Sequence, residues 1–386
     1  MEKKYFYFQP QYVSRFKCDG SKCDAHCCKE EWNIAVDEDT YKQYEQLGAS
    51  VTSHLKFNDD KEQYIIDFGG EKYCPFLNEK KLCRLQLMYG ENFLSRTCST
   101  YPRITNLFGY FFERSLIMSC PLAAEMILFE DAPMVFEFAE VSEKVHSNEG
   151  KFFYQRAEST EELRAHMMEI QVAMISILQE RTLTIDQRLI VLGFFVDRLG
   201  EIFADFDENA LTKLIAAYES KKFLAEQVPL MLRAVTFDAE KFVGLMRKLL
   251  DEVFGEENLL RNRKFLDTVV DSAPLIAEKK FFVAEHASFF ENYLVNELFL
   301  NIYPWKFEEG SIAQNFAAFV AEYKFFEQIV FSVSRKGFNS RKDLIEVTTW
   351  FATRFDHTKE FKQKIFSCVK DSEPFELMSS LLEGSD

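Results

Sequence analysis

Eight of the nine cysteines in this 386-residue chain fall within its first 120 residues, and this clustering constrains the fold more than any other feature. The ninth, Cys368, stands alone near the end of the sequence. Dense thiols followed by a long stretch without them indicate a metal or cluster site, a disulfide framework, or both. The eight clustered residues are Cys18, Cys23, Cys27, Cys28, Cys74, Cys83, Cys98 and Cys120.

The rest of the composition favours a reducing setting for these thiols. We find no apolar run of signal-peptide length near the N-terminus, and no stretch of about 18 uncharged apolar residues that would predict a membrane span. We therefore expect a cytoplasmic protein with no membrane partner, whose cysteines bind metal rather than form disulfides. The formal net charge of −16 argues against nucleic acid as a partner.

The cysteine spacing leaves the identity of the metal open. Thiolates hold either zinc or iron–sulfur clusters, and eight of them suffice for two zinc sites or for one cluster with additional structural thiols. The adjacent pair Cys27 and Cys28 suits a larger cluster or two nearby centres, because neighbouring side chains diverge. His26 lies in the same motif and is a weaker candidate ligand. Arg96 and Arg103 flank Cys98 and are candidate cofactor-binding residues, since a guanidinium can offset thiolate charge or bind a carboxylate.

Two regions of the chain have different patterns. Residues 1–130 combine short apolar segments with many turn formers, which predicts an irregular α+β module with little core of its own. Residues 131–160 are acidic and contain Pro133 and Gly150, which indicates a linker. From 161 to 386, apolar residues recur at three- and four-residue spacing, as in amphipathic helices. The expected fold class is mainly α: a cysteine-rich metal-binding module followed by a large helical domain for substrate recognition.

Individual elements can be predicted within both regions. In the first we expect strands over 32–36 and 63–68, two more over 103–117, a helix capped by Asp37 or Asp39, and another that starts at Pro121. In the second, a helix ends near Glu180, and further helices are expected near 186–204, 208–220, 238–254, 276–301, 312–335, 340–354 and 358–370.

Several common catalytic motifs are absent from the sequence. It contains no phosphate-binding loop, no glycine-rich dinucleotide fingerprint and no hydrolase nucleophile elbow. The Cys-x3-Cys-x2-Cys motif of ordinary radical enzymes is incomplete, because Glu30 stands where its third cysteine would be.

The motifs F-K-C-x4-C-x3-C-C, C-P-F-L, R-T-C-x2-Y-P-R and S-C-P resemble those of the flagellin lysine-N-methylase family, which shares its cysteine layout with a broader group of zinc- or iron-chelating proteins. Q-P-Q-Y-V-S-R-F-K-C near the start and E-N-Y-L-V-N-E-L-F-L-N-I-Y-P-W from Glu291 to Trp305 also resemble the methylase. The resemblance therefore runs over both halves of the chain. It implies transfer of methyl groups from S-adenosylmethionine to surface lysines of flagellin, in the cytoplasm, with a 4Fe–4S cluster required.

The implied reaction leaves the role of the metal open. A neutral lysine amine attacks a sulfonium methyl group directly, and its deprotonation from a pKa of about 10.4 is favoured by an apolar, tyrosine-lined pocket. A cluster with an open iron position can instead anchor S-adenosylmethionine, or reduce it and start radical chemistry. The candidate catalytic residues are Tyr101, Arg103 and Glu113, and further pocket candidates are Asn292, Tyr293, Asn296 and Glu297. The alternatives to an enzyme are a zinc-stabilised adaptor and a metal-delivery or redox carrier.

Overall fold

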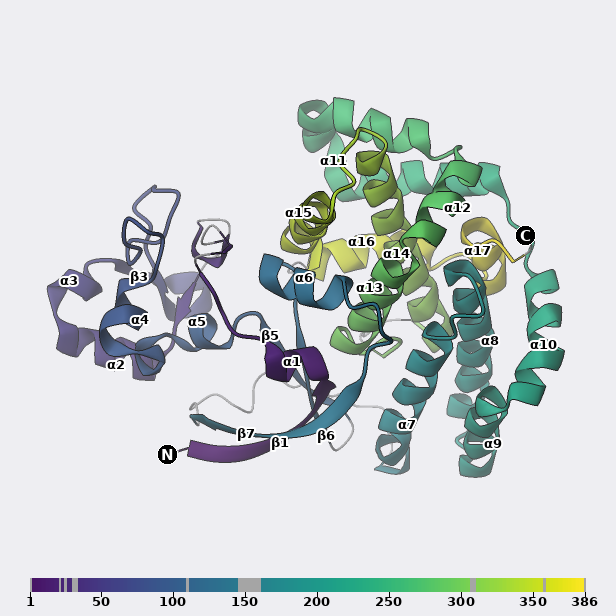
Figure 1. Ribbon diagram of the computed structural model, residues 1–386, viewed down its shortest axis with the longest axis horizontal. Coiled ribbons are helices and arrows are strands. Elements are labelled where there is room, and N and C mark those ends of the chain that lie inside the picture. The colour runs from purple at the N-terminus through teal and green to yellow at the C-terminus, as the bar shows by residue number, and fades with distance from the viewer. Residues whose placement is uncertain are drawn as a thin grey trace. The chain divides into compact units, whose positions relative to one another are not determined.

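The computed structural model describes residues 2–20, 22–23, 26–29, 34–108, 111–144, 161–305, 310–356 and 359–384. The chain divides into two compact units (Figure 1). The first, called the cysteine-rich unit, comprises residues 1–106, 112–126 and 136–153. The second, called the helical unit, comprises residues 107–111, 127–135 and 154–386.

A four-stranded sheet with the order β5-β6-β1-β7 brings the beginning of the chain beside residues more than 100 positions away. Strand β1 (Glu2–Pro10) pairs antiparallel with β7 (Phe136–Lys144) along its whole length and parallel with β6 (Phe111–Leu116). The fourth strand is β5 (Arg103–Phe108). Phe8 of β1 packs on the rings of Phe136 and Phe138 of β7, so aromatic contacts reinforce the pairing. The long β1–β7 ribbon is visible beside α1 (Gln11–Arg15) in Figure 1.

The cysteine-rich unit also has a small apolar core of its own, which corrects the expectation of little core. A three-stranded sheet with the order β2-β4-β3 consists of β2 (Ala35–Val36), β4 (Gln63–Ile66) and β3 (Leu55–Asn58). The helices α2 (Glu38–Leu47) and α3 (Ala49–Thr52) accompany it. The core residues are Ile34, Val36, Tyr44, Val51, Ile66, Phe68, Cys74, Phe76 and Leu85, with Cys28, Cys83 and Cys98 packed against them.

Three short helices contain or directly follow cysteines: α4 (Arg84–Tyr89), α5 (Arg96–Thr100) and α6 (Pro121–Leu128). Pro121 starts α6 as expected, because its fixed φ suits the first helical position and its missing N–H is not needed there. Asp37 caps α2 by accepting from the amide of Thr40, which also confirms a prediction.

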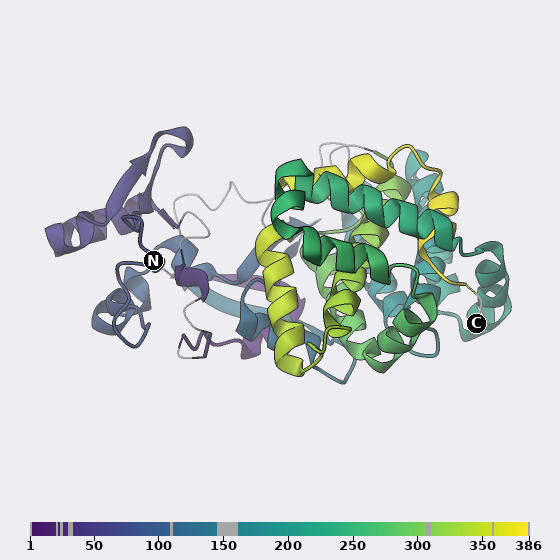
Figure 2. The ribbon, with the colours of Figure 1, turned by 90° about the horizontal axis from the view of Figure 1, so that it is seen from above.

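The helical unit is a bundle whose helices run in several directions (Figures 1 and 2). Its members are α7 (Glu161–Leu178), α8 (Ile185–Ala204), α9 (Glu208–Glu219), α10 (Lys221–Ala234), α11 (Ala239–Ser272), α12 (Ile276–Glu285), α13 (Ala287–Leu300), α14 (Ile312–Ser334), α15 (Arg341–Phe351), a π-helical turn (Ala352–Asp356), α16 (Lys359–Val369) and α17 (Pro374–Leu381).

Helix α14 lies at the centre of this unit. All its residues from Asn315 to Ser332 are buried, and it packs against α8, α11, α15, α16 and α17. Aromatic rings fill much of the space around it, for example Tyr293 of α13, which stacks on Phe326 with the ring centroids 3.8 Å apart. The 41 phenylalanines of the sequence are explained in part by this packing.

The expected fold class, mainly α with a small α+β region, is confirmed. Residues 131–160 were expected to be an acidic linker. Of these, 131–135 belong to the helical unit and 136–144 form β7. Residues 145–160 lie outside the described residues. Among the helices of the described residues, none is long and apolar enough to cross a membrane.

Candidate functional site

All eight clustered cysteines line one cavity of about 410 Å3 in the cysteine-rich unit. We call it the cysteine cavity. The remainder of its wall is mostly apolar or aromatic and includes Phe16, Ile34, Tyr44, Ile66, Phe76, Leu82, Leu85, Leu94, Tyr101 and Pro102. The fold therefore converts eight positions spread over 103 residues of sequence into a single, thiol-lined space with a largely apolar surround.

Backbone hydrogen bonds connect the segments of the wall that contain Cys28, Cys74 and Cys83. Cys28 ends a short 3-10 turn (His26–Cys28), and its carbonyl accepts from the amide of Cys74 at 2.8 Å. The chain then makes a compact loop, in which Leu77 bridges to Cys83. Cys83 is the residue immediately before α4, so both ends of the loop present a thiol to the cavity.

Two further cysteines of the wall, Cys98 and Cys120, lie in or next to short helices. Cys98 lies in α5, where its amide donates to the capping hydroxyl of Ser95, and the amide of Arg96 donates to Asp37 at 2.7 Å. Asp37 thereby joins the start of α5 to the start of α2. Cys120 directly precedes α6, and the amides of Leu122 and Ala123 donate towards its sulfur. The start of α6 therefore directs backbone dipoles at Cys120, whereas Cys98 is contacted by the Ser95 side chain.

Burial makes the thiols costly to ionise in the absence of a cation. It raises the pKa of Cys74, Cys98 and Cys120 each to about 12, and it raises the pKa of Cys18 as well. The sulfurs of Cys27 and Cys28 lie 3.9 Å apart, and their hydrogen bond lowers the pKa of Cys27 while it raises that of Cys28. A positive centre among these groups would favour their thiolate forms.

The eight thiols line one cavity but do not converge on one point. Within the described ranges, no three His, Cys, Asp or Glu side chains converge closely enough to hold one metal ion. The thiols instead surround a space that is wider than a closed tetrahedral zinc site requires. Soft thiolate ligands can hold either zinc or iron–sulfur clusters.

Of the candidate catalytic residues, Tyr101 lines the cysteine cavity. Its hydroxyl shares a hydrogen bond of 3.0 Å with the hydroxyl of Ser119, one residue before Cys120. Burial, followed by the nearby Cys120 thiolate, raises the pKa of Tyr101 well above its ordinary value. The phenol therefore remains protonated and can donate a hydrogen bond inside the cavity.

Arg96, Arg103 and Glu113 are placed outside the cavity wall. Arg103 donates to the carbonyl of Phe16 at 3.1 Å, and its guanidinium lies 5.1 Å from the centre of the Phe16 ring. Phe16 lines the cavity two residues before Cys18, so Arg103 contacts a residue of the wall without lining the cavity itself. Glu113 is buried in β6 opposite Phe8. The side chain of His26 lies outside the described residues.

Lys81 and Tyr44 are among the polar residues of the cavity wall that were not predicted from the sequence. Lys81 lies in the loop between Cys74 and Cys83 and is a cationic member of the wall, with its ammonium also 5.0 Å from the Tyr73 ring centre. Its place between two cysteines is a signal that could have identified it. Tyr44 of α2 is also part of the wall, but nothing in its sequence neighbourhood distinguishes it from a core residue.

The pocket candidates of α13 are buried in the helical unit and line neither this cavity nor the one described next. The side-chain amide of Asn292 donates to the carbonyl of Glu130 at 2.8 Å, and Tyr293 stacks on Phe326. Asn301 donates to the carboxylate of Glu297. Asn296 is fully buried. These contacts join α13 to its surroundings.

A second cavity, of about 320 Å3, lies in the helical unit. We call it the lysine cavity. Its wall combines the turn before α8 with parts of α8, α12 and α14 and with the last described residues. The charged residues of the wall are Arg181, Asp186, Arg188, Lys279, Lys280, Lys324, Glu327 and Glu383, and the apolar ones include Phe237, Ile276, Val283, Ala284, Ala287 and Leu381.

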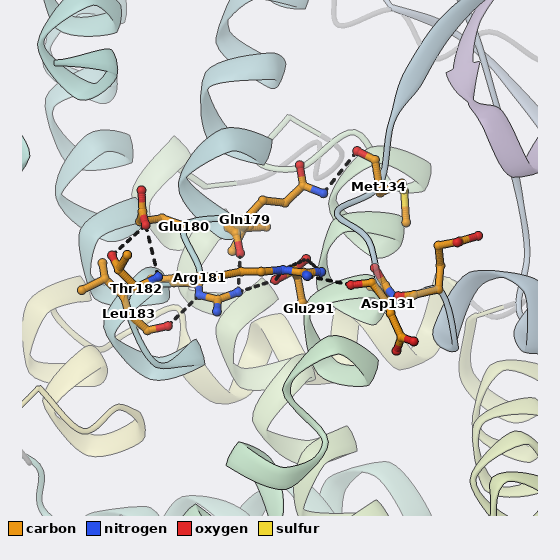
Figure 3. A network of polar contacts seen from close by, with 12 residues as sticks. Asp131, Met134, Gln179, Glu180, Arg181, Thr182, Leu183 and Glu291 are labelled. Carbon is orange, nitrogen blue, oxygen red and sulfur yellow. Dashed lines mark hydrogen bonds and ion pairs between the residues drawn. The ribbon is translucent and has the colours of Figure 1, made fainter. Parts of the chain in front are cut away.

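Glu291 of α13 binds Arg181, a residue of the lysine cavity wall (Figure 3). Arg181 donates to both oxygens of this carboxylate, and Arg188 donates to it at 2.6 Å. Arg181 also donates to the carbonyl of Asp131, and the side chain of Gln179 donates to the carbonyl of Met134. The network therefore anchors residues 131–134 to the helices.

Comparison with known proteins gives matches over both halves of the chain. The model of the FliB lysine N-methylase C-terminal domain family matches residues 171–382. A curated protein named lysine-N-methylase, from Salmonella typhimurium, is 26% identical over 91% of this chain and 92% of its own length. A second lysine-N-methylase, from Salmonella choleraesuis, is 25% identical over the same shares.

A third relative matches a shorter part of the chain. The flagellar biosynthetic protein FliU of Salmonella muenchen is 34% identical over 128 residues, which cover 31% of this chain and 75% of that protein. No solved structure matches the chain significantly.

Proposed function

The chain belongs to the FliB lysine N-methylase family, and we propose that it transfers methyl groups from S-adenosylmethionine to lysine side chains of flagellin. The family membership supports lysine N-methylation. The name of the flagellar relative supports a flagellar protein as the substrate. The observation that carries the metal part of the proposal is the convergence of eight thiols on the cysteine cavity.

We propose that a 4Fe–4S cluster is held by cysteines of this cavity. When bound, such a cluster supplies a redox-active iron centre with net positive charge to offset the thiolates. The chain contributes the surroundings: the aromatic and apolar wall excludes water, and the amides at the start of α6 stabilise the Cys120 thiolate. Lys81 adds a positive charge to the same wall.

The overall reaction is balanced without any additional reactant. The bond between the sulfonium sulfur and the methyl carbon breaks, and a bond from that carbon to the lysine nitrogen forms. The products are methyl-lysine, S-adenosylhomocysteine and one proton released from the substrate ammonium. An apolar surround assists by lowering the pKa of the incoming lysine, and the Tyr101 phenol is placed to hydrogen-bond to a group that enters the cavity.

The experiment that tests this proposal combines metal analysis with a methylation assay on anaerobically purified protein. We expect a brown protein with similar amounts of iron and sulfide and broad absorption near 400 nm. Incubation with flagellin and S-adenosylmethionine should add mass increments of methyl groups to flagellin lysines. A matched sample treated with an iron chelator should lose both the colour and the activity.

Two results would overturn parts of the proposal. Methyl transfer that persists after all iron has been removed would exclude a role for the cluster. A colourless protein with stoichiometric zinc and no transfer to flagellin would favour a zinc-stabilised adaptor instead.

A further inference from the structure

Helix α4, which directly follows Cys83, exposes a run of three apolar side chains. Leu87 is 61% exposed, Met88 68% and Tyr89 39%. We call these three residues the α4 patch. Successive residues of a helix point about 100° apart, so this six-residue helix cannot turn all three towards the small core that Leu85 joins. Single exposed apolar residues are common, but three in one run beside a cavity indicate an interaction surface.

The α4 patch is continuous with the wall of the cysteine cavity. Leu87 belongs to both, and Leu94, a few residues further along the chain, also lines the cavity. Because Leu87 is both exposed and part of the wall, it lies at the opening of the cavity. The ring of Tyr89 packs beside that of Phe93, with the ring centroids 5.1 Å apart, so the end of the patch is supported from below. A chain that enters the cavity beside Leu87 therefore meets the rest of the patch outside it.

Carboxylates near the same opening favour the approach of a basic side chain. Asp19 lines the cavity, and Glu91 is the second residue after α4. Burial is the main cause of the raised pKa of Cys18, and Asp19 and Glu91 add to it, so both carboxylates lie near this thiol. Asp19 is offset by Lys81 of the wall and pairs with Lys22 at 3.3 Å. Glu91 and the net charge of −16 therefore supply the attraction for a substrate lysine.

We propose that the α4 patch binds apolar side chains that flank the target lysine of the protein substrate, while the lysine itself enters the cysteine cavity. The inference deepens the proposed function and rests on it for the place of the reaction. An extended chain advances about 3.3 Å per residue, so side chains that reach the patch lie within about three residues of the lysine. A lysine with only polar neighbours lacks these contacts. The patch therefore selects among the lysines of a substrate by their apolar neighbours.

The main test measures steady-state kinetics with flagellin on the full-length, anaerobically purified protein. The test variant combines Met88→Ser with Tyr89→Ser, because these two residues, unlike Leu87, are not among the described residues of the cavity wall. We expect the KM for flagellin to rise about tenfold or more and the turnover number to change less than about twofold. Contacts made equally in the bound complex and in the transition state affect KM alone. The iron content of the double variant should equal that of the wild type.

Phe57→Ser is the matched control. Phe57 lies in β3 of the same unit, is 49% exposed and is not among the described residues of the cavity wall. This control should keep the wild-type KM, and the melting temperatures of all variants are compared. Met88→Ser alone replaces the double variant if the latter fails to fold.

A second readout uses peptide binding and needs no catalysis. Two fluorescently labelled peptides of about nine residues carry one central lysine, flanked at the second and third positions on either side by leucine in one peptide and by serine in the other. Binding is measured by fluorescence anisotropy. The wild type and Phe57→Ser should bind the leucine peptide about tenfold more tightly than the serine peptide, because the leucines bury apolar surface on the patch. The double variant should lose this preference.

The outcomes separate this inference from the proposed function. If the wild type methylates flagellin and the double variant has the same KM, or if the KM rises equally in Phe57→Ser, the inference is wrong and the proposed function stands. Equal binding of the two peptides to the wild type would also overturn the inference. A wild-type dimer that the double variant dissociates, as seen by sedimentation, would make the patch an interface between copies of the chain. Patch-dependent binding of the leucine peptide without methylation of flagellin would retain the docking surface and reject the proposed function.

Discussion

Arg188 of α8 and Glu291 of α13 form an ion pair of 2.6 Å in which the two side chains are only 4% and 1% exposed. Arg188 also donates to the carbonyls of Leu178 and Leu183, so it connects the end of α7 and the following turn to the same carboxylate. Charges this deeply buried contribute little net stability when paired, but each becomes costly if the other is removed. A substitution that removes the charge of either residue should therefore destabilise the helical unit.

We expect Glu291→Gln to lower the free energy of unfolding by about 3 kcal/mol, because Arg188 would then be buried without a counter-charge. The measurement is urea unfolding monitored by circular dichroism. The control is Glu201→Gln on α8, the helix that carries Arg188. Its pair with Arg198 is more than half exposed, so its loss should cost less than about 1 kcal/mol. Equal effects of the two substitutions would contradict this prediction.

The stability of the protein should depend on pH through Lys279. Its pKa of about 8 in the folded state lies below the ordinary lysine value, so the unfolded chain binds more protons between these two values. Stability should therefore rise by about 2 kcal/mol between pH 7 and 9.5, relative to Lys279→Met, in the absence of ligand. The titratable groups that face it are Lys324 and Glu327 of α14, Asp186 of α8 and Glu383. Parallel stability curves for the two proteins would show that Lys279 titrates normally.

We expect Cys28→Ala to remove most of the bound iron and the methyltransferase activity, because Cys28 lines the cysteine cavity. Cys368→Ala is the matched control, since Cys368 is buried in α16 and lines neither cavity. The measurement is iron per protein together with absorption near 400 nm. Retention of full iron content by Cys28→Ala would exclude this residue as a required ligand.

Tyr101→Phe should lower the turnover number by about a hundredfold, if the phenol hydrogen-bonds to a reacting group in the cavity. Iron content and melting temperature should change little, because only the hydrogen bond to Ser119 is lost. Steady-state kinetics with flagellin give the answer. Ser119→Ala removes the partner but keeps the phenol, so a loss as large as that of Tyr101→Phe would indicate that the hydroxyl only positions the ring.

Local signals in the sequence predicted local structure well. The cap at Asp37 and the start of α6 at Pro121 depend on hydrogen bonding and backbone geometry within a few residues. The strand pair over 103–117 was likewise visible as two apolar segments, and it appears as β5 and β6. The prediction over 276–301 was wrong in one respect, since α12 ends at Glu285 and α13 begins at Ala287 without a glycine or proline between them.

Elements that depend on distant partners were missed. Strand β1 pairs with β7, which is more than 120 residues away, and neither has a clear alternation of polar and apolar side chains. Helix α10 was not expected either, and it contains Pro229 in its interior. Proline removes a backbone donor and disfavours a helix, but tertiary contacts with α8 and α9 compensate here.

The site was predictable in its chemistry and not in its geometry. The cysteine count indicated a metal centre, yet only the fold shows that Cys18 and Cys120 line the same space. The lysine cavity left a weaker signal in the sequence: Lys324 and Glu327 are charged residues within a mostly apolar segment of α14. Charges at such positions indicate a buried polar site, but the sequence does not reveal that α8 and α12 supply its remaining groups.

The burial of α14 on all sides has a consequence for how the helical unit can change. In a solenoid each helical pair contacts only its neighbours, so pairs can be deleted or duplicated with the rest intact. Here α8, α11, α15, α16 and α17 all pack on one helix, although they are distributed over almost 200 residues of sequence. The unit should therefore unfold in a single cooperative step, and variation among its relatives should occur by substitution and by loop length, with the complement of helices conserved.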